Sequence, residues 1–116
     1  MSWATGYIEK LANGEQVEFR PRGNSMKPLI NSGDLVVVAP FDLDTELFVD
    51  EIVLCKVKGK QYLHKIVGKK RLPDVPTTCG PVKVWSYLIG NNRGHVNGWV
   101  FCHSIYGVLL VNKRKG

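Results

Sequence analysis

Apolar residues come only in short runs in this chain, and this pattern limits the possible folds more than any other feature. The longest wholly apolar run is Leu35–Ala39, which contains three consecutive valines. β-Branched residues favour extended strands, and a run of this length is far too short to cross a bilayer. Gly, Pro and Asn recur between the runs, as is typical of turns. The pattern therefore predicts several short β-strands and no membrane insertion.

Two neighbouring stretches predict a β-hairpin. Apolar and polar residues alternate through Glu51–Val57, and the chain returns as a second strand over Lys60–Val67. Lys58-Gly59 between them forms a two-residue turn of the kind that joins antiparallel strands. The remaining predicted strands are Gln16–Arg20, Leu35–Ala39, Val82–Ile89 and Tyr106–Asn112.

One short helix is expected, near the N-terminus. Tyr7, Ile8 and Leu11 share one helical face, and Asn13-Gly14 ends the helix because both residues tolerate positive φ. The predicted loops are the acidic Asp42–Asp50, the proline-containing Lys69–Pro81 and the Gly- and Asn-rich Gly90–Gly98. Short strands with a single helix predict a mainly β domain, built as a compact barrel-like sheet or a sandwich.

Length and charge set the scale of the molecule and suggest partners. A chain of 116 residues suits one domain with a core of its own. Sixteen Lys and Arg against ten Asp and Glu give a net charge of +6, which is compatible with an acidic partner such as nucleic acid. The charge is spread, with its densest clusters at Lys69–Arg71 and Lys113–Lys115. Nucleic-acid binding is therefore possible but not favoured over solvated surface charge.

Cysteine usage and the N-terminal residues bear on location. Cys55, Cys79 and Cys102 are an odd number and lack the spacing of a metal motif, so no metal or other cofactor is expected. An odd count suits a reducing compartment. Met1–Leu11 lacks the apolar centre of a secretory signal peptide and contains Glu9. We therefore expect a soluble, cytoplasmic protein.

A serine in a tight turn is the first candidate for chemistry. Ser25 lies between Gly23 and Pro28, which would place its hydroxyl on a sharp bend beside exposed backbone N–H groups. A nucleophile in acyl transfer needs this combination of an accessible oxygen and donors for the developing oxyanion. The alternative is a turn serine that hydrogen-bonds to its own backbone.

Histidine and asparagine supply the other candidates. His64 falls on the second strand of the predicted hairpin, where a neutral imidazole could activate a serine hydroxyl, although a strand histidine can also be structural. The Gly90–Gly98 segment offers Asn91, Asn92 and Asn97 but no aspartate. Their amide oxygens could orient the imidazole, or the segment could simply be a polar turn. The nearby His95 could be a partner or a surface residue.

In this order, these stretches resemble the superfamily of signal peptidases and LexA-type self-cleaving repressors. The resemblance extends over about Phe19 to Val100, which is most of the chain. The matching stretches are Ser25–Pro28, Gly33–Val37, Asp50–Val53, His64–Val67 and Gly90–Asn92.

The resemblance implies an all-β peptidase core in which Ser25 is the nucleophile. Bacterial signal peptidases and LexA-type proteins use a lysine as the base, whereas the endoplasmic-reticulum and archaeal signal peptidases use a histidine. This sequence is similar to the histidine branch, with His64 as the base, because Lys65 would point to the opposite face of the strand. The backbone N–H of Ser25 and the side chain of Asn24 would hold the oxyanion.

Some features depart from the family pattern. Asn91 stands where the family usually has aspartate, and Asn97 where histidine-type members have a second acid. We expect neither a membrane anchor nor a helix-turn-helix domain, so neither processing at a bilayer nor repression is expected. The sequence predicts a soluble serine endopeptidase that acts on a peptide or protein substrate. The alternative is a weak or inactive peptidase fold that binds a protein or nucleic acid.

Overall fold

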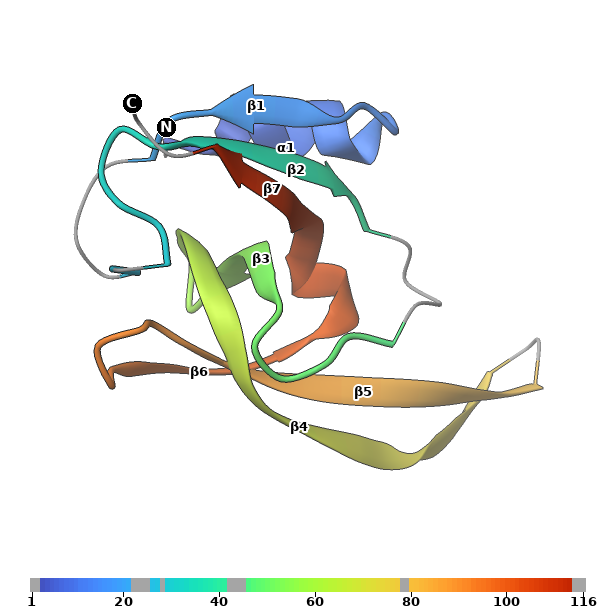
Figure 1. The fold of residues 1–116 in the computed structure, drawn as a ribbon. Coiled ribbons are helices and arrows are strands. Elements are labelled where there is room, and N and C mark those ends of the chain that lie inside the picture. Colours follow the sequence, from blue (N-terminus) through green and yellow to red (C-terminus); the bar gives the residue numbers. More distant parts are fainter. Residues whose placement is uncertain (1–2, 22–25, 28, 42–45, 78–79, 114–116) are drawn as a thin grey trace.

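The computed structural model describes residues 3–21, 26–27, 29–41, 46–77 and 80–113, with the backbone alone over 72–77 and 80–84 (Figure 1). Seven strands form one antiparallel sheet in the order β1-β2-β7-β3-β4-β5-β6. The elements are α1 (Thr5–Ala12), β1 (Val17–Phe19), β2 (Leu35–Pro40), β3 (Ile52–Val57), β4 (Lys60–Thr77), β5 (Gly80–Gly90), β6 (Val96–Phe101), a 3₁₀ turn (Cys102–Ser104) and β7 (Ile105–Lys113). The prediction of a mainly β chain with one short helix is confirmed. Within the described residues no helix is long and apolar enough to cross a membrane.

The central hairpin follows directly from its turn residues. Lys58 and Gly59 both have positive φ, at 51° and 82°, as a two-residue turn between twisted strands requires. Val57 is therefore opposite Lys60, and the register places His64 opposite Val53. The turn thus fixes where His64 lies along the sheet.

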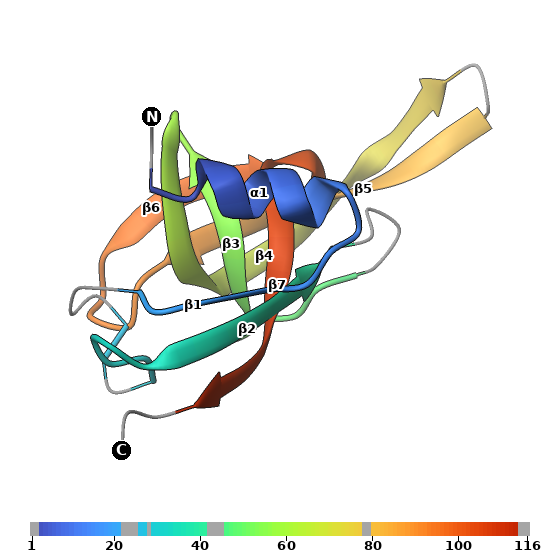
Figure 2. The same ribbon diagram turned by 90° about the horizontal axis from the view of Figure 1, so that it is seen from above.

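The helix covers one of two apolar cores. Leu11 is buried, and it joins Val17 and Phe19 of β1 and Val36 and Val38 of β2 in the first core. Figure 2 shows α1 lying across the strands. Gly107 of β7 makes this approach possible, since a Cβ there would lie 2.5 Å from Val38 and 2.9 Å from Leu11.

The sheet curls, so that its β4–β6 half encloses the second core. Strand β3 contributes to both cores because successive side chains point to opposite faces: Leu54 belongs to the first, and Val53 and Cys55 to the second. Burial raises the pKa of the Cys55 thiol to about 12, consistent with an inert core residue. Strands β3 and β6 are not neighbours in the sheet, yet a Cβ at Gly98 would lie 3.4 Å from Val57.

The prediction that Lys69–Pro81 forms a long loop is wrong. Strand β4 continues through this segment to Thr77, and β5 begins at Gly80. Strand β3 pairs with β4 only as far as Lys65, and Ile66 still bonds to Asp50 and Glu51 just before β3. Beyond Ile66, β5 is the only strand that pairs with β4 in the described sheet. A strand with one free edge tolerates proline, as do bulges, and the register is irregular between Leu72 and Val75. The prolines therefore mark an edge rather than a loop.

The predicted turn Gly90–Gly98 is too long. The chain turns only over residues 91–95, and β6 begins at Val96. Strand β6 was not predicted, because its residues do not alternate between buried and exposed. Val96 is exposed, and Val100 is the single buried residue of the strand. Its pairing with β5 comes from tertiary contact, with Gly98 opposite Ile89. This strand matters because it carries Asn97.

Candidate active site

His64 is a buried polar side chain on the second strand of the hairpin. Only 7% of its surface is exposed. The ring of Tyr62 lies 4.8 Å from the imidazole, centroid to centroid. The two side chains are two positions apart on β4 and so share one face of the strand. The strand therefore fixes the imidazole on one side, with Tyr62 packed against it.

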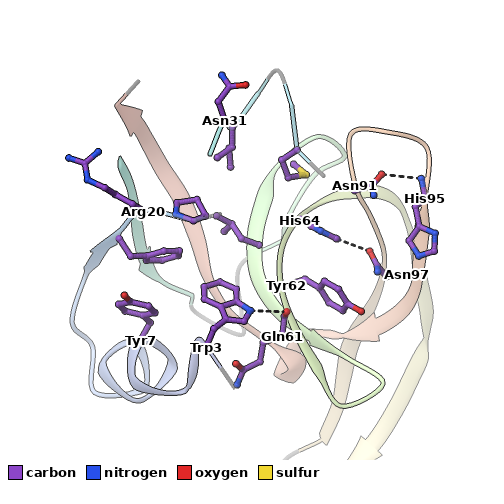
Figure 3. Close-up of a pocket in the computed structure, with 15 residues that line it drawn as sticks. Trp3, Tyr7, Arg20, Asn31, Gln61, Tyr62, His64, Asn91, His95 and Asn97 are labelled. Carbon is purple, nitrogen blue, oxygen red and sulfur yellow. Dashed lines mark hydrogen bonds between the residues drawn. The ribbon is translucent and has the colours of Figure 1, made fainter. Parts of the chain in front are cut away.

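Asn97 of β6 is the polar partner of His64. Its Oδ1 lies 2.7 Å from His64 Nδ1, and Figure 3 shows the two side chains pointing toward each other from different strands. Taking the amide oxygen as the atom that faces the ring, Nδ1 carries the proton and Nε2 is the basic nitrogen. A neutral amide thus orients the imidazole, as in the Cys-His-Asn arrangement of papain-like proteases.

The surroundings keep the imidazole neutral. Burial lowers the pKa of His64 below its ordinary value of 6.5, because the charged form loses hydration. The hydrogen bond to Asn97 acts in the opposite direction, and the nearby charge of His95 lowers the pKa further. His64 is therefore in its base form at neutral pH.

Asn91 and Asn92 form hydrogen bonds with groups other than the imidazole. The Oδ1 of Asn91 accepts from the backbone N–H of Arg93, at 2.8 Å, and of His95, at 3.0 Å, which shapes the turn. The Oδ1 of Asn92 accepts from Lys65 Nζ at 2.9 Å. Of the three candidate asparagines, Asn97 is the one whose amide meets the imidazole.

Asn92 also connects the turn to the segment that contains the candidate serine. Its Nδ2 donates to the carbonyl oxygen of Lys27 at 2.8 Å. Met26 is buried, and its carbonyl accepts from Ile30 N at 2.9 Å. Ser25 and Asn24 lie outside the described residues. The structure thus places the residues that follow Ser25, but not the serine itself.

A buried aspartate holds the next turn. Asp34, 2% exposed, accepts through Oδ2 from Asn31 N at 2.8 Å and from Asn112 Nδ2 at 3.2 Å. Arg20 Nη1 donates to the carbonyl of Gly33 at 2.7 Å. Asp34, which belongs to the Gly33–Val37 stretch of the family resemblance, is therefore a structural residue that ties this turn to β7.

These elements surround a cavity of about 720 Å³, within the size range of ligand sites in proteins. His64, Asn97, Asn91 and His95 are polar lining residues on one side of it, and the lining also includes the polar side chains of Arg20, Asn31 and Gln61. Apolar side chains line the rest, among them Met26, Ile30, Phe19, Tyr7 and Trp3. The candidate base therefore borders a space large enough for several substrate groups.

Some lining residues were not identified from the sequence. Tyr62 could have been found, because it is two positions before His64 and strand periodicity places both on one face. Trp3 and Tyr7 could not, because only the docking of α1 brings them to the cavity. His95, left open between partner and surface residue, is exposed but lines the cavity. Among the described side chains no group of three His, Cys, Asp or Glu could hold a metal ion.

Comparisons of the chain with models of protein families, with curated proteins and with solved structures find no match. The function must therefore be argued from the motifs and the geometry of the cavity.

Proposed function

We propose that this chain is a serine endopeptidase-like protein that hydrolyses peptide bonds with Ser25 and His64. The observation that carries the proposal is the 2.7 Å contact between His64 Nδ1 and Asn97 Oδ1 beside a large cavity. An oriented, neutral imidazole is the base that activates a serine hydroxyl. Met26, the residue after Ser25, lines the same cavity, so chain connectivity supports pairing the two candidates.

In this proposal the hydroxyl oxygen of Ser25 attacks the carbonyl carbon of the scissile peptide bond. His64 Nε2 takes the hydroxyl proton and passes it to the leaving amine as the C–N bond breaks. Water then attacks the acyl-enzyme while His64 accepts its proton. The ester C–O bond to Ser25 breaks, His64 returns the proton to the serine oxygen, and the acid is released. The backbone N–H of Ser25 and the side chain of Asn24 stabilise the oxyanion.

The proposal includes a core of the signal-peptidase and LexA type. Its support is the order of the motifs together with the curled antiparallel sheet, which gathers motif-bearing segments around one cavity. His64 comes from β4, Asn91 from the turn after β5, and Met26 from the segment before β2. Chain segments distant in sequence thus contribute to one site.

The experiment that tests the activity is digestion of a diverse peptide mixture, read by mass spectrometry. Wild type is compared with Ser25→Ala and with the matched control Ser32→Ala, which removes an exposed serine hydroxyl close by in the chain. We expect new fragments from wild type and Ser32→Ala, and none from Ser25→Ala. Identical fragment patterns for wild type and Ser25→Ala would contradict the proposal.

The second candidate is a binding module with a peptidase fold. It is favoured by the amide at Asn97, which cannot stabilise an imidazolium as a carboxylate would. The substitution Asn97→Asp discriminates the two. A peptidase gains hydrolytic rate because the carboxylate makes His64 a stronger base, whereas a binding module gains no hydrolysis and keeps its protein or nucleic-acid partner in Ser25→Ala.

A further inference from the structure

The cavity has two parts with different chemistry. Figure 3 shows His64 and Asn97 on one side of it, and Tyr7 and Trp3 on the other. The first part offers amides and imidazoles, while the second offers aromatic faces. A substrate that fills both parts must therefore carry an apolar group away from the bond that reacts.

Three aromatic rings lie together in the apolar part of the lining, which we call the aromatic part. Tyr7 stacks on Phe19 with ring centroids 4.5 Å apart, and Trp3 is tilted against Phe19 at 5.6 Å. Trp3 is nonetheless 50% exposed, so much of its indole is available for contact. Aromatic walls of this kind bind large apolar side chains, since they offer broad contact area with little loss of side-chain entropy.

The aromatic part is fastened to the strand that carries His64. Trp3 Nε1 donates to the carbonyl oxygen of Gln61 at 3.2 Å, and Ala4 N donates to Gln61 Oε1 at 2.9 Å. Gln61 is three residues before His64 on β4. The distance between the two parts of the cavity is therefore set by one strand, and such preorganisation lowers the cost of binding.

The charge of the cavity lining favours one class of ligand. Arg20 lines the cavity and uses Nη1 to bind the carbonyl of Gly33, which leaves further N–H donors of its fork for a ligand. None of the described lining residues is acidic. The cavity therefore complements an anionic group, and guanidinium binds carboxylates well.

We propose, on the basis of the peptidase function above, that the aromatic part is a substrate subsite for a large apolar side chain and that Arg20 binds an adjacent carboxylate. The substrate class is peptides in which a bulky apolar residue neighbours Asp or Glu, away from the scissile bond. Trp3, Tyr7 and Arg20 then determine specificity, while Ser25 and His64 perform the chemistry.

The test is selection of peptides on the full chain carrying Ser25→Ala, which keeps the cavity but removes the nucleophile. Randomised decapeptides are equilibrated with the protein, and the retained ones are sequenced by mass spectrometry. We expect enrichment of Phe, Trp, Leu or Met beside Asp or Glu. Adding Trp3→Ala lowers the apolar enrichment about tenfold, and adding Arg20→Gln abolishes the acidic preference alone. The matched control Trp99→Ala removes an exposed indole outside the cavity and changes neither.

A second measurement needs no change to the aromatic residues. In the Ser25→Ala chain, a selected peptide shifts the NMR signal of the Trp3 indole N–H and leaves that of Trp99 in place. A shift at Trp99 alone, or retained peptides without apolar enrichment, would overturn the subsite.

The subsite and the peptidase activity can fail separately. Wild type is incubated with the selected peptides and, separately, with the unselected decapeptides, and fragments are sought. Selective retention without cleavage supports the subsite and contradicts the peptidase function. Cleavage of peptides regardless of their apolar and acidic residues supports the peptidase function and overturns the subsite.

Discussion

Strand β4 carries two polar regions that differ in charge and in surroundings. Near its start, His64 is buried, neutral and beside a cavity. Further along, Lys69 is a partly exposed cation and does not line that cavity. Both regions are formed by contacts between distant segments, so the difference lies in what each side chain faces.

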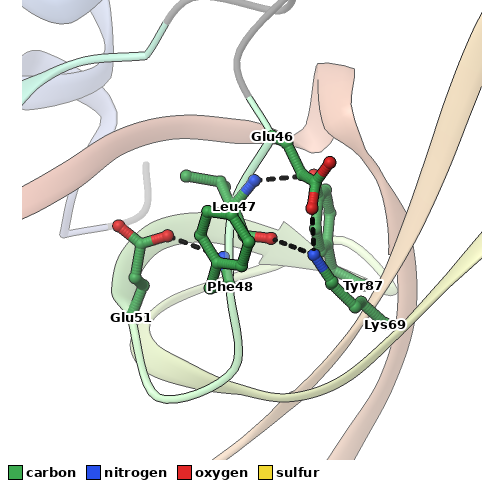
Figure 4. Close-up of polar contacts among 6 residues, drawn as sticks. All are labelled: Glu46, Leu47, Phe48, Glu51, Lys69 and Tyr87. Atoms are coloured by element: carbon green, nitrogen blue, oxygen red, sulfur yellow. Dashed lines mark hydrogen bonds and ion pairs between the residues drawn. The ribbon is translucent and has the colours of Figure 1, made fainter.

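The ammonium group of Lys69 is surrounded by protein groups that interact with it (Figure 4). Lys69 forms an ion pair with Glu46 and donates to the carbonyl oxygen of Leu47 at 3.2 Å. Its Nζ also lies 4.1 Å from the ring centroid of Phe48 and 4.6 Å from that of Trp85. The ammonium group is thus engaged on several sides and holds the segment before β3 against β4.

The two regions differ as a structural site differs from a chemical one. The cation at Lys69 is surrounded by groups that stabilise its charge, and it does not line the cavity beside His64. The imidazole at His64 is oriented through one nitrogen and opens on a cavity of about 720 Å³. The first arrangement favours stability, and the second favours proton transfer.

The largest effect is expected when the base is removed. His64→Gln should lower peptide hydrolysis by about 10²–10⁴-fold, the usual contribution of a general base. The control His103→Gln makes the same change at an exposed histidine and should leave the rate unchanged. Initial rates on a cleaved peptide check this. An equal loss of rate in both variants would show that His64 has no special role in hydrolysis, and so that its region is not a chemical site.

The next largest effect concerns Asn97. Asn97→Ala should lower the rate by roughly tenfold or more, less than the ~10⁴-fold cost of neutralising a charged orienting residue. It should also lower the pKa of His64 further, because the bond to Asn97 raises it. The acidic limb of the pH–rate profile then moves to lower pH, and an NMR titration of His64 reports the same shift. An unchanged titration would show that the bond does not control the base.

Tyr87 tests how the Lys69 region is built. Its hydroxyl accepts from the buried backbone N–H of Leu47 at 3.1 Å, and Tyr87 is fully buried. Tyr87→Phe leaves that donor unpaired and should cost about 1–3 kcal/mol in the free energy of unfolding. Urea denaturation measures the loss, while hydrolysis by the folded variant should be unchanged. A large loss of hydrolysis would show that the two regions are coupled.

A smaller effect is expected at Lys69 itself. Lys69→Met removes a partly exposed ion pair and its contacts with two rings, for a loss of about 1 kcal/mol. The loss should shrink in high salt because exposed charges are screened. Denaturation at low and high salt checks this, with Lys70→Met as control, since Lys70 lies over Trp99 instead. A salt-independent loss would indicate that packing rather than charge holds the segment.

The smallest effect is the pH dependence of stability due to His64. Its pKa in the folded chain lies below the ordinary value of 6.5, so the unfolded chain binds the proton at higher pH. The contribution of neutral His64 to the free energy of unfolding should therefore be fully present above about pH 7. It should be lost as the pH falls through 6.5 toward the pKa of His64 in the folded chain. Wild type should lose more stability than His64→Gln between pH 7 and 5. Parallel curves would mean that His64 is not desolvated.

Local patterns could predict much of the fold. The alternation in β3, the Lys58-Gly59 turn and the apolar face of α1 each depend on neighbours in the sequence. Strand β6 could not be predicted, because its burial does not alternate and its partner β5 supplies its hydrogen bonds. The far part of β4 was missed for a similar reason, since proline signals a loop unless a strand edge is free.

The sequence by itself determined the strands other than β6 and the far part of β4, the hairpin register and the residue types available for chemistry, because these follow from backbone preference and period-two alternation. Only the tertiary structure decided which asparagine meets His64, and that Trp3, Tyr7 and Arg20 share its cavity. Those pairings join segments far apart in the chain. They depend on how the sheet curls and where α1 docks, and the packing of the two cores fixes both.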